Sequence, residues 1–332
     1  YGEDLEASIE RLHGRVHRGG YRPQPSRRLS IPKEDGRRRM LGVAALEDKI
    51  LQGAVVNVLN AVYEQDFLGF SYGFRPGRSQ HDALDALAYS IRNTAVNWVL
   101  DLDIQRFFDT LDQDWLMRFV EHRIEDTRIQ RLIRQWLKAG AIEDGEWQAT
   151  ESGTPQGGVA SPLLANIYLH YSFDLWANRW RRREARGNVT IVRYADDIVC
   201  GFQYQGDARR FQKALRERLE QFGLSMHSDK TRLVEFGRFA HQHRTVRGLG
   251  KPETFDFLGF NHICGRTREG KFLLRRKTCR DRMRVTLKAL KEGLMLRRHL
   301  SIPEQGQWLG RVVRGYFAYH AVPTNRASLQ GF

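Results

Sequence analysis

Residues 191–200 read Ile-Val-Arg-Tyr-Ala-Asp-Asp-Ile-Val-Cys, with two adjacent carboxylates between two short apolar runs. The pattern predicts strands over residues 189–194 and 198–202, joined by a tight turn at the acidic pair. Two neighbouring carboxylates repel each other and are costly to bury, so the turn is expected to face a solvent-filled cleft where a divalent cation offsets the repulsion. Taken alone, the same pattern also fits an ordinary acidic β-turn.

A second apolar run also ends on a carboxylate. Residues 98–103 read Trp-Val-Leu-Asp-Leu-Asp, which predicts a buried strand over residues 97–103 that ends at Asp103. If this strand lies beside the acidic turn, Asp103, Asp196 and Asp197 converge at one edge of a sheet. Oxygen ligands of this kind suit Mg²⁺, with Mn²⁺ as the alternative, and two such ions about 4 Å apart form the clamp used in nucleotidyl transfer. Asp101 would point to the same face, so spacing alone does not choose between Asp101 and Asp103.

The order of the other expected elements predicts an α+β fold, because strands do not alternate regularly with helices. Ser79 and Asp82 form a capping pattern at the start of one helix. We expect an antiparallel sheet with helices packed on one face. Helices are expected at residues 5–17, 46–63, 79 onward, 115–123, 127–137, 161–183 and 207–222, and further strands at residues 255–260 and 272–274.

The charge of the chain favours a polyanionic partner. Lys and Arg number 54 against 39 acidic residues, a net charge of 54 − 39 = +15. Residues 261–300 alone hold 13 basic and 3 acidic residues, or 13 − 3 = +10, and such concentration is typical of nucleic-acid binding. The sequence shows no signal pattern and no apolar run long enough for a membrane span, so we expect a cytoplasmic, nucleoid-associated protein without a membrane partner.

Seven motifs, in the same order, make the chain resemble the reverse transcriptases encoded by bacterial group II introns. They extend over most of residues 20–320. The motifs are IPKEDGRRRMLG (31–42), GFSYGFRPG (69–77), DIQRFFD (103–109), GTPQGG with SPLLAN (153–158 and 161–166), YADD (194–197), HSDKT (227–231) and FLGF (257–260).

The resemblance implies roles for individual residues. It selects Asp103 over Asp101 as the metal ligand, because the family's metal-binding Asp precedes the Phe-Phe pair by four and five residues; Asp101 then becomes a lesser structural residue. It implies that Phe108 excludes a 2′-hydroxyl and so favours deoxynucleotides. The implied contacts to the incoming dNTP are Lys33, Arg39, Phe108, Gln156 and Lys230, the last as a possible general acid, and the implied primer grip is Phe257, Leu258, Gly259 and Phe260.

The resemblance also implies a right-hand fold with an antiparallel palm sheet, mixed fingers and an α-helical thumb. The expected domains are fingers at residues 1–95, a palm with a fingers insertion at 96–264, and a thumb, or maturase domain X, at 265–332. The chain departs from the family at Arg106, where members commonly have Gly. Candidate nucleic-acid contacts are Arg75, Arg275, Arg276, Lys277 and Arg280.

These features predict an RNA-directed DNA polymerase that extends a DNA or RNA primer with dNTPs on an RNA template, and that also binds group II intron RNA as a splicing maturase. One alternative is an RNA-binding splicing cofactor without chemistry of its own. An RNA-dependent RNA polymerase would share the palm, but the bulk of Phe108 argues against it. A domesticated reverse transcriptase serving defence or repair is a further alternative.

Overall fold

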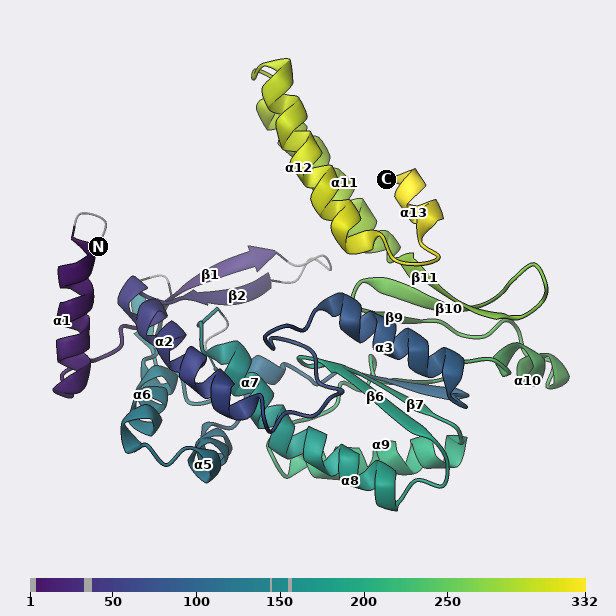
Figure 1. The fold of residues 1–332 in the computed structure, drawn as a ribbon, viewed down its shortest axis with the longest axis horizontal. Coiled ribbons are helices and arrows are strands. Elements are labelled where there is room, and N and C mark those ends of the chain that lie inside the picture. The colour runs from purple at the N-terminus through teal and green to yellow at the C-terminus, as the bar shows by residue number, and fades with distance from the viewer. Residues whose placement is uncertain (1–3, 33–37, 144, 155–156) are drawn as a thin grey trace.

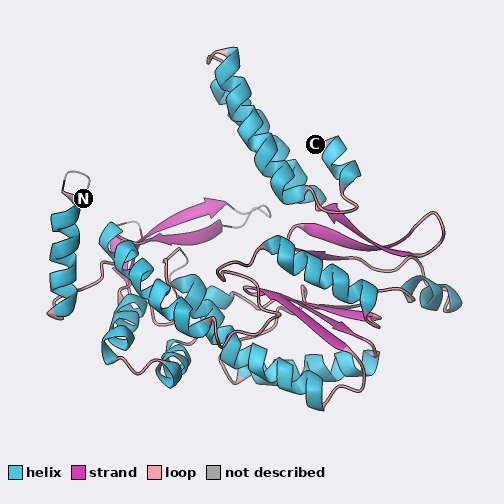
Figure 2. Cartoon of the chain, in the orientation of Figure 1, coloured by secondary structure: helices cyan, strands magenta, loops and turns pink. Residues whose placement is uncertain are grey.

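The computed structural model describes residues 4–32, 38–143, 145–154 and 157–332. A four-stranded sheet lies at its centre and carries the acidic turn. The strands are β6 (Val189–Tyr194), β7 (Asp197–Phe202), β3 (Trp98–Leu102) and β8 (Arg232–Glu235), in the order β6-β7-β3-β8. Every neighbouring pair is antiparallel, which confirms the predicted antiparallel sheet. Figure 2 shows these strands among the surrounding helices.

Both faces of the central sheet are covered, so the expectation that helices pack on one face is wrong. The alternation of side chains in β3 and β7 explains why. Leu100, Ile198 and Cys200 belong to the core cluster that contains the apolar side of α9 (Gln205–Glu220). Their neighbours Val99 and Val199 belong to the cluster that contains α3 (Gln80–Asn93). A sheet buried on both faces needs apolar side chains on both, and these two strands supply them.

Helix α3 begins at the predicted capping box. Ser79 accepts a hydrogen bond from the Asp82 backbone, and the Asp82 carboxylate accepts one from the Ser79 backbone at 2.7 Å. Two orphan backbone donors are thereby satisfied at the helix start. The helix contacts β6, β7 and β11 (Phe272–Thr278), so it lies with the central sheet rather than with the N-terminal strands (Figure 1). The boundary near residue 95 stays a prediction.

A second, mixed sheet lies near the N-terminus, in the order β2-β1-β4-β5. Strand β1 pairs antiparallel with β2 and parallel with β4. Helices lie around it. The sequence predicted four of them closely, at residues 5–17, 46–63, 115–123 and 127–137, and did not predict the short helix at residues 107–110. The elements are α1 (Leu5–His17), β1 (Ser26–Pro32), β2 (Arg38–Val43), α2 (Leu46–Tyr63), α4 (Phe107–Thr110), α5 (Gln113–Arg123), α6 (Thr127–Lys138), β4 (Ala141–Glu143) and β5 (Glu146–Gln148).

The predicted helix over residues 161–183 is continuous but not uniform. It consists of α7 (Ser161–Leu169), a π-helical turn η1 (His170–Asp174) and α8 (Leu175–Arg183). Such π-turns are frequent at functional sites, where an extra residue shifts the faces of a helix. Here the turn ends at Asp174, which is fully buried.

The C-terminal part has a three-stranded antiparallel sheet and a helical pair that projects from the body (Figure 1). Pro303 lies in the first turn of α12, where the N–H that proline lacks would have no intrahelical partner. None of the residues of α11 is buried. The elements are α10 (Ala240–Val246), β9 (Phe255–Phe257), β10 (Phe260–Arg266), β11, α11 (Arg280–Arg297), α12 (Ile302–His320) and α13 (Arg326–Gly331). Among the described residues, no helix is long and apolar enough to span a membrane.

Candidate active site

The strand register brings the predicted carboxylates to one edge of the central sheet. Tyr194 pairs with Asp197 across the β6–β7 hairpin, so Ala195 and Asp196 form its two-residue turn. On the other side of β7, Leu102 pairs with Ile198, which makes Asp103 and Asp197 the next residues beyond that pair. The sequence-predicted juxtaposition of these strands is therefore present.

The turn has a constrained backbone. Ala195 has a φ of 55°, a left-handed conformation that is uncommon for a residue with a side chain. Gly73 lies directly against it, because a Cβ at Gly73 would be 2.3 Å from the Ala195 nitrogen. Only a glycine allows the loop at residues 69–77 to approach the turn this closely.

Lys230 lies beside Asp103. Its Nζ is 2.6 Å from Asp103 Oδ2, and the Asp103 carbonyl accepts a hydrogen bond from the His227 backbone at 2.8 Å. The HSDKT segment is thus attached to the end of β3, and it places a cation among the carboxylates. This proximity is compatible with the predicted role of Lys230 in handling a phosphate, which stays a prediction.

A recess of about 290 Å³ opens beside Asp197 and is lined by Asp101, Asp256, Cys279 and Arg282, among others. Burial, followed by the charges of Asp196 and Asp103, raises the pKa of Asp197 to about 6. Burial and the charge of Asp197 raise the pKa of Asp101 to about 7. Asp101 is therefore more than a remote structural residue, because it shares the recess and the electrostatics of Asp197.

The raised pKa of Asp101 predicts a pH-dependent stability. Between its ordinary value of 3.8 and about 7, the folded protein retains a proton that the unfolded chain has lost. The stabilisation from this proton is complete below pH 4 and is lost as the pH rises through 7. In metal-free protein we expect Asp101→Asn to raise the melting temperature at pH 8 by a few degrees, and to change it little at pH 4. Calorimetry in EDTA measures both; an equal shift at the two pH values would contradict the assignment.

Phe108 is half-buried and lies beside the Gly-rich turn at residues 153–158. Gly153 and Thr154 donate backbone hydrogen bonds to the carbonyls of Leu111 and Phe108, at 2.7 and 2.9 Å. Phe107 is buried in the core, in an edge-to-face contact with Phe108.

Gly157 lies against the N-terminal sheet. A Cβ there would lie 2.5 Å from the Gly42 carbonyl of β2, so the turn and this strand are in close contact. Lys33 and Gln156 lie outside the described residues. Arg39 lies on β2, where its backbone pairs with Ile31.

The backbone conformation at Arg106 is one that favours glycine. Its φ is 48°, so the backbone is left-handed where the resemblance predicts Gly. Arg106 thus has the left-handed conformation expected for glycine, although an arginine adopts it less readily.

The FLGF segment forms a strained turn between β9 and β10. Phe257 pairs with Phe260, and the two turn residues Leu258 and Gly259 have φ values of 47° and 81°. The C-terminal helices hold this turn, since Tyr319 Oη donates to the Leu258 carbonyl at 2.8 Å and the Cys279 backbone donates to the Gly259 carbonyl at 3.0 Å. These bonds hold the turn in a fixed shape, and Phe257, Leu258 and Gly259 line the recess beside Asp197. Their role as a primer grip stays a prediction.

Two predicted nucleic-acid contacts are wrong. Arg75 is buried and donates to Glu64 and to the carbonyls of Leu68 and Ser71, so its guanidinium organises its own loop.

Arg276 is 2% exposed and pairs with Asp85 at 2.7 Å. Neither side chain can reach a phosphate without losing these partners. Arg275, Lys277 and Arg280 are exposed, and their contacts stay a prediction.

The carboxylates have the chemistry of a divalent-cation site. Among the described residues, no three Asp, Glu, His or Cys side chains form a ready-made metal cluster. One Asp103 oxygen points to Lys230 instead. The donors are nevertheless oxygens only. Burial, followed by the charges of Asp196 and Asp103, raises the pKa of Asp197, and a hard cation would relieve the repulsion among these carboxylates. The donor set fits Mg²⁺ or Mn²⁺.

Sequence reasoning missed Arg193, Asp256 and Arg282. Arg193 stands between apolar residues of a central strand, and a lone cation in such a run signals a buried, paired group. Asp256 and Arg282 had no comparable signal, because they reach the recess only through the fold of β9 and α11.

Comparisons with known proteins agree with this geometry. The model of the family "Reverse transcriptase (RNA-dependent DNA polymerase)" matches residues 31–262. Protein YkfC of Escherichia coli is 36% identical over 279 residues, which cover 73% of this chain and 72% of YkfC. The group II intron-encoded protein LtrA of Lactococcus lactis is 40% identical over 166 residues, which cover 50% of this chain but 27% of LtrA.

A solved structure has the same fold at low sequence identity. The apo telomerase of Candida tropicalis, truncated from its C-terminal domain, matches with a TM-score of 0.56 at 12% identity, over 76% of this chain and 55% of the telomerase chain. At this identity the likeness concerns the fold alone.

Proposed function

The chain belongs to the reverse transcriptase (RNA-dependent DNA polymerase) family, and we propose that it extends a primer with deoxynucleotides on an RNA template. The observation that carries the proposal is the convergence of Asp103 and Asp197 at one sheet edge, with Asp196 in the adjoining turn. Phe108 and the Gly-rich turn adjoin one another, and the FLGF turn borders the recess beside Asp197. The sites for the incoming nucleotide and for the primer end would thus both lie next to the acidic turn.

The mechanism is mainly positioning and charge stabilisation. Asp103, Asp196 and Asp197 would hold divalent cations, which when bound activate the primer hydroxyl and stabilise the charge of the leaving pyrophosphate. The Leu258–Gly259 turn would support the primer end. Phe108 would close the space beside the sugar, so that a 2′-hydroxyl does not fit. Lys230 would move from Asp103 to the triphosphate and could donate a proton there.

Lys230→Met tests that last role. The variant keeps the length of the side chain and removes its charge and its donors, so we expect single-nucleotide incorporation to slow by about a hundredfold. Primer–template binding should be unchanged, because Lys230 lies at the carboxylates. Lys213, an exposed lysine on α9, provides the control variant Lys213→Met. Equal rates for wild type and Lys230→Met in rapid-quench measurements would exclude Lys230 from the chemical step.

Run-off synthesis tests the proposed activity itself. Purified protein, a labelled DNA primer and an RNA template should give full-length complementary DNA with all four dNTPs and Mg²⁺ or Mn²⁺. Omission of one dNTP should stop the product at the first position that requires it. Absence of any dNTP-dependent product on RNA templates would contradict the proposal.

We propose a second function, the binding of folded group II intron RNA as a splicing cofactor. The support is the 40% identity with LtrA together with exposed cations on β11 and α11, including Arg275, Lys277 and Arg280. Such contacts would be sensitive to salt and tolerant of sequence. If RNA binding suffices for splicing, the Asp196→Ala protein should still promote splicing of the precursor RNA transcribed from its own genomic locus. Loss of splicing by this variant at wild-type RNA affinity would contradict a role without chemistry.

A further inference from the structure

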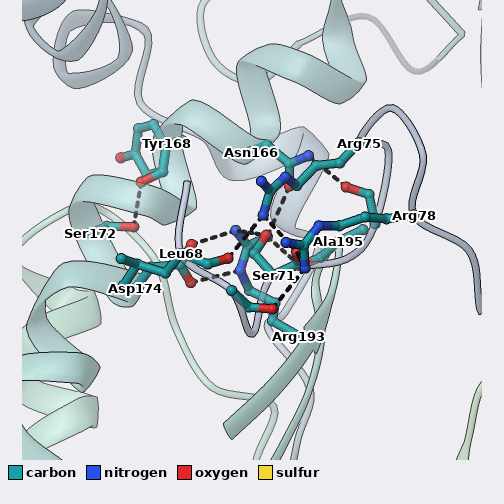
Figure 3. Close-up of polar contacts among 12 residues, drawn as sticks. Leu68, Ser71, Arg75, Arg78, Asn166, Tyr168, Ser172, Asp174, Arg193 and Ala195 are labelled. Carbon is teal, nitrogen blue, oxygen red and sulfur yellow. Dashed lines mark hydrogen bonds and ion pairs between the residues drawn. The ribbon is translucent and has the colours of Figure 1, made fainter. Parts of the chain in front are cut away.

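Behind the acidic turn lies a buried polar network centred on Arg193 (Figure 3). Arg193 is on β6, one residue before Tyr194, and both Arg193 and its ion-pair partner Asp174 have no exposed side-chain surface. A buried ion pair rarely adds stability compared with apolar residues of similar size. Its position directly behind the acidic turn therefore suggests that the ion pair orients the carboxylates of that turn.

Every donor of the guanidinium is used. Nε and Nη2 donate to the two oxygens of Asp174, at 2.7 and 2.5 Å. Nη1 donates to Asn166 Oδ1 at 2.9 Å and to the Ala195 carbonyl at 3.0 Å. The second hydrogen of Nη2 goes to Ser71 Oγ at 2.7 Å. Arg has five N–H donors, and all five have acceptors here.

These acceptors come from three segments, namely the continuous helix over residues 161–183, the loop before α3 and the acidic turn. Asp174 is at the end of the π-turn, Asn166 on α7, Ser71 in the loop before α3, and Ala195 in the acidic turn. The bond to the Ala195 carbonyl fixes the peptide unit that joins Ala195 to Asp196. Arg193 thus connects that peptide to one helix and one loop, neither of which contains any of the three carboxylates.

The opposite side of the turn is held through the same network. Asn166, which accepts from Arg193, donates to the Gly73 carbonyl at 2.6 Å. Gly73 in turn abuts the Ala195 nitrogen. The left-handed Ala195 is therefore restrained at its carbonyl by Arg193 and at its nitrogen by Gly73. Unfavourable backbone conformations persist where surrounding contacts over-determine them in this way.

We infer that Arg193 is a positioning residue, which through Ala195 sets the direction of the Asp196 and Asp197 carboxylates and couples it to Asp174, Asn166 and the loop at Ser71. The inference rests on the proposed polymerase function. A lysine has three donors on one nitrogen and cannot satisfy acceptors on all sides of a planar guanidinium. The turn should then lose its fixed geometry, while the surfaces expected to bind nucleic acid are unchanged.

The test compares Arg193→Lys with Arg276→Lys. Arg276 is also a buried arginine, 2% exposed and paired with the exposed Asp85, and it lies on β11 instead of β6. We expect Arg193→Lys to weaken Mn²⁺ binding about tenfold or more, measured by electron paramagnetic resonance without nucleotide. Turnover should fall by about a hundredfold at wild-type affinity for primer–template. Arg276→Lys should lower the melting temperature and leave Mn²⁺ binding unchanged.

A second variant keeps the test decisive if the lysine unfolds the protein. Arg193→Met with Asp174→Leu replaces the ion pair by apolar groups, so that no unpaired charge is buried. A folded double variant with wild-type Mn²⁺ binding and turnover would overturn the inference. Equal losses of Mn²⁺ binding in Arg193→Lys and Arg276→Lys would also overturn it. If wild-type protein neither binds Mn²⁺ nor extends a primer, the proposed function fails instead.

Discussion

Asp196→Ala is expected to reduce primer extension by about a thousandfold or more, while RNA binding stays within a factor of about two. The residue lies in the two-residue turn between β6 and β7, adjoining Asp197 and the end of β3. Its carboxylate would hold a cation on which both the attacking and leaving oxygens depend. The exposed cations that would bind RNA, Arg275, Lys277 and Arg280, lie on other elements, β11 and α11.

Two measurements on one preparation separate chemistry from binding. Single-turnover extension gives the chemical rate, and filter binding of labelled RNA gives the affinity. Asp114→Ala, an exposed carboxylate on α5, is the matched control and should behave as wild type. Extension by Asp196→Ala at the wild-type rate would refute the assignment of the acidic turn.

Phe108→Val should change which sugar is accepted. We expect incorporation of NTPs relative to dNTPs to rise by about a hundredfold, because the smaller side chain leaves room for a 2′-hydroxyl. Phe108 is half-buried and its backbone carbonyl accepts a hydrogen bond from Thr154, whereas its neighbour Phe107 is 2% exposed and belongs to the core.

Phe107→Leu therefore serves as the control for Phe108→Val. It should lower the stability by about 1 kcal/mol and leave sugar selectivity unchanged. The ratio of kcat/KM for matched dNTP and NTP pairs provides the readout. An unchanged ratio in Phe108→Val, with normal dNTP incorporation, would assign sugar discrimination to another residue.

Local signals in the sequence predicted much of the fold. The helix ranges 5–17 and 46–63 match α1 and α2, since their apolar spacing is regular. The two strands around the acidic turn followed from short β-branched runs between polar residues. The second covered face of the sheet was missed, because it depends on which distant helix packs there.

The two wrong predictions of nucleic-acid contacts, at Arg75 and Arg276, have a physical cause. Arg275, Arg276 and Lys277 are consecutive on a strand, and a strand turns neighbouring side chains to opposite faces. One of the three must therefore face inward, and Arg276 does. Strand periodicity could have predicted this, whereas the burial of Arg75 depends on Glu64 and loop carbonyls that only the folded chain brings together.

Competition between dNTPs and NTPs on an RNA template tests the central claim most directly. With a primer annealed to RNA and equal concentrations of the matched dNTP and NTP, wild-type protein should add the deoxynucleotide in large excess. The claim of RNA-templated DNA synthesis at Asp103, Asp196 and Asp197 predicts this product. Preferential addition of the ribonucleotide, or no addition of either, would contradict it.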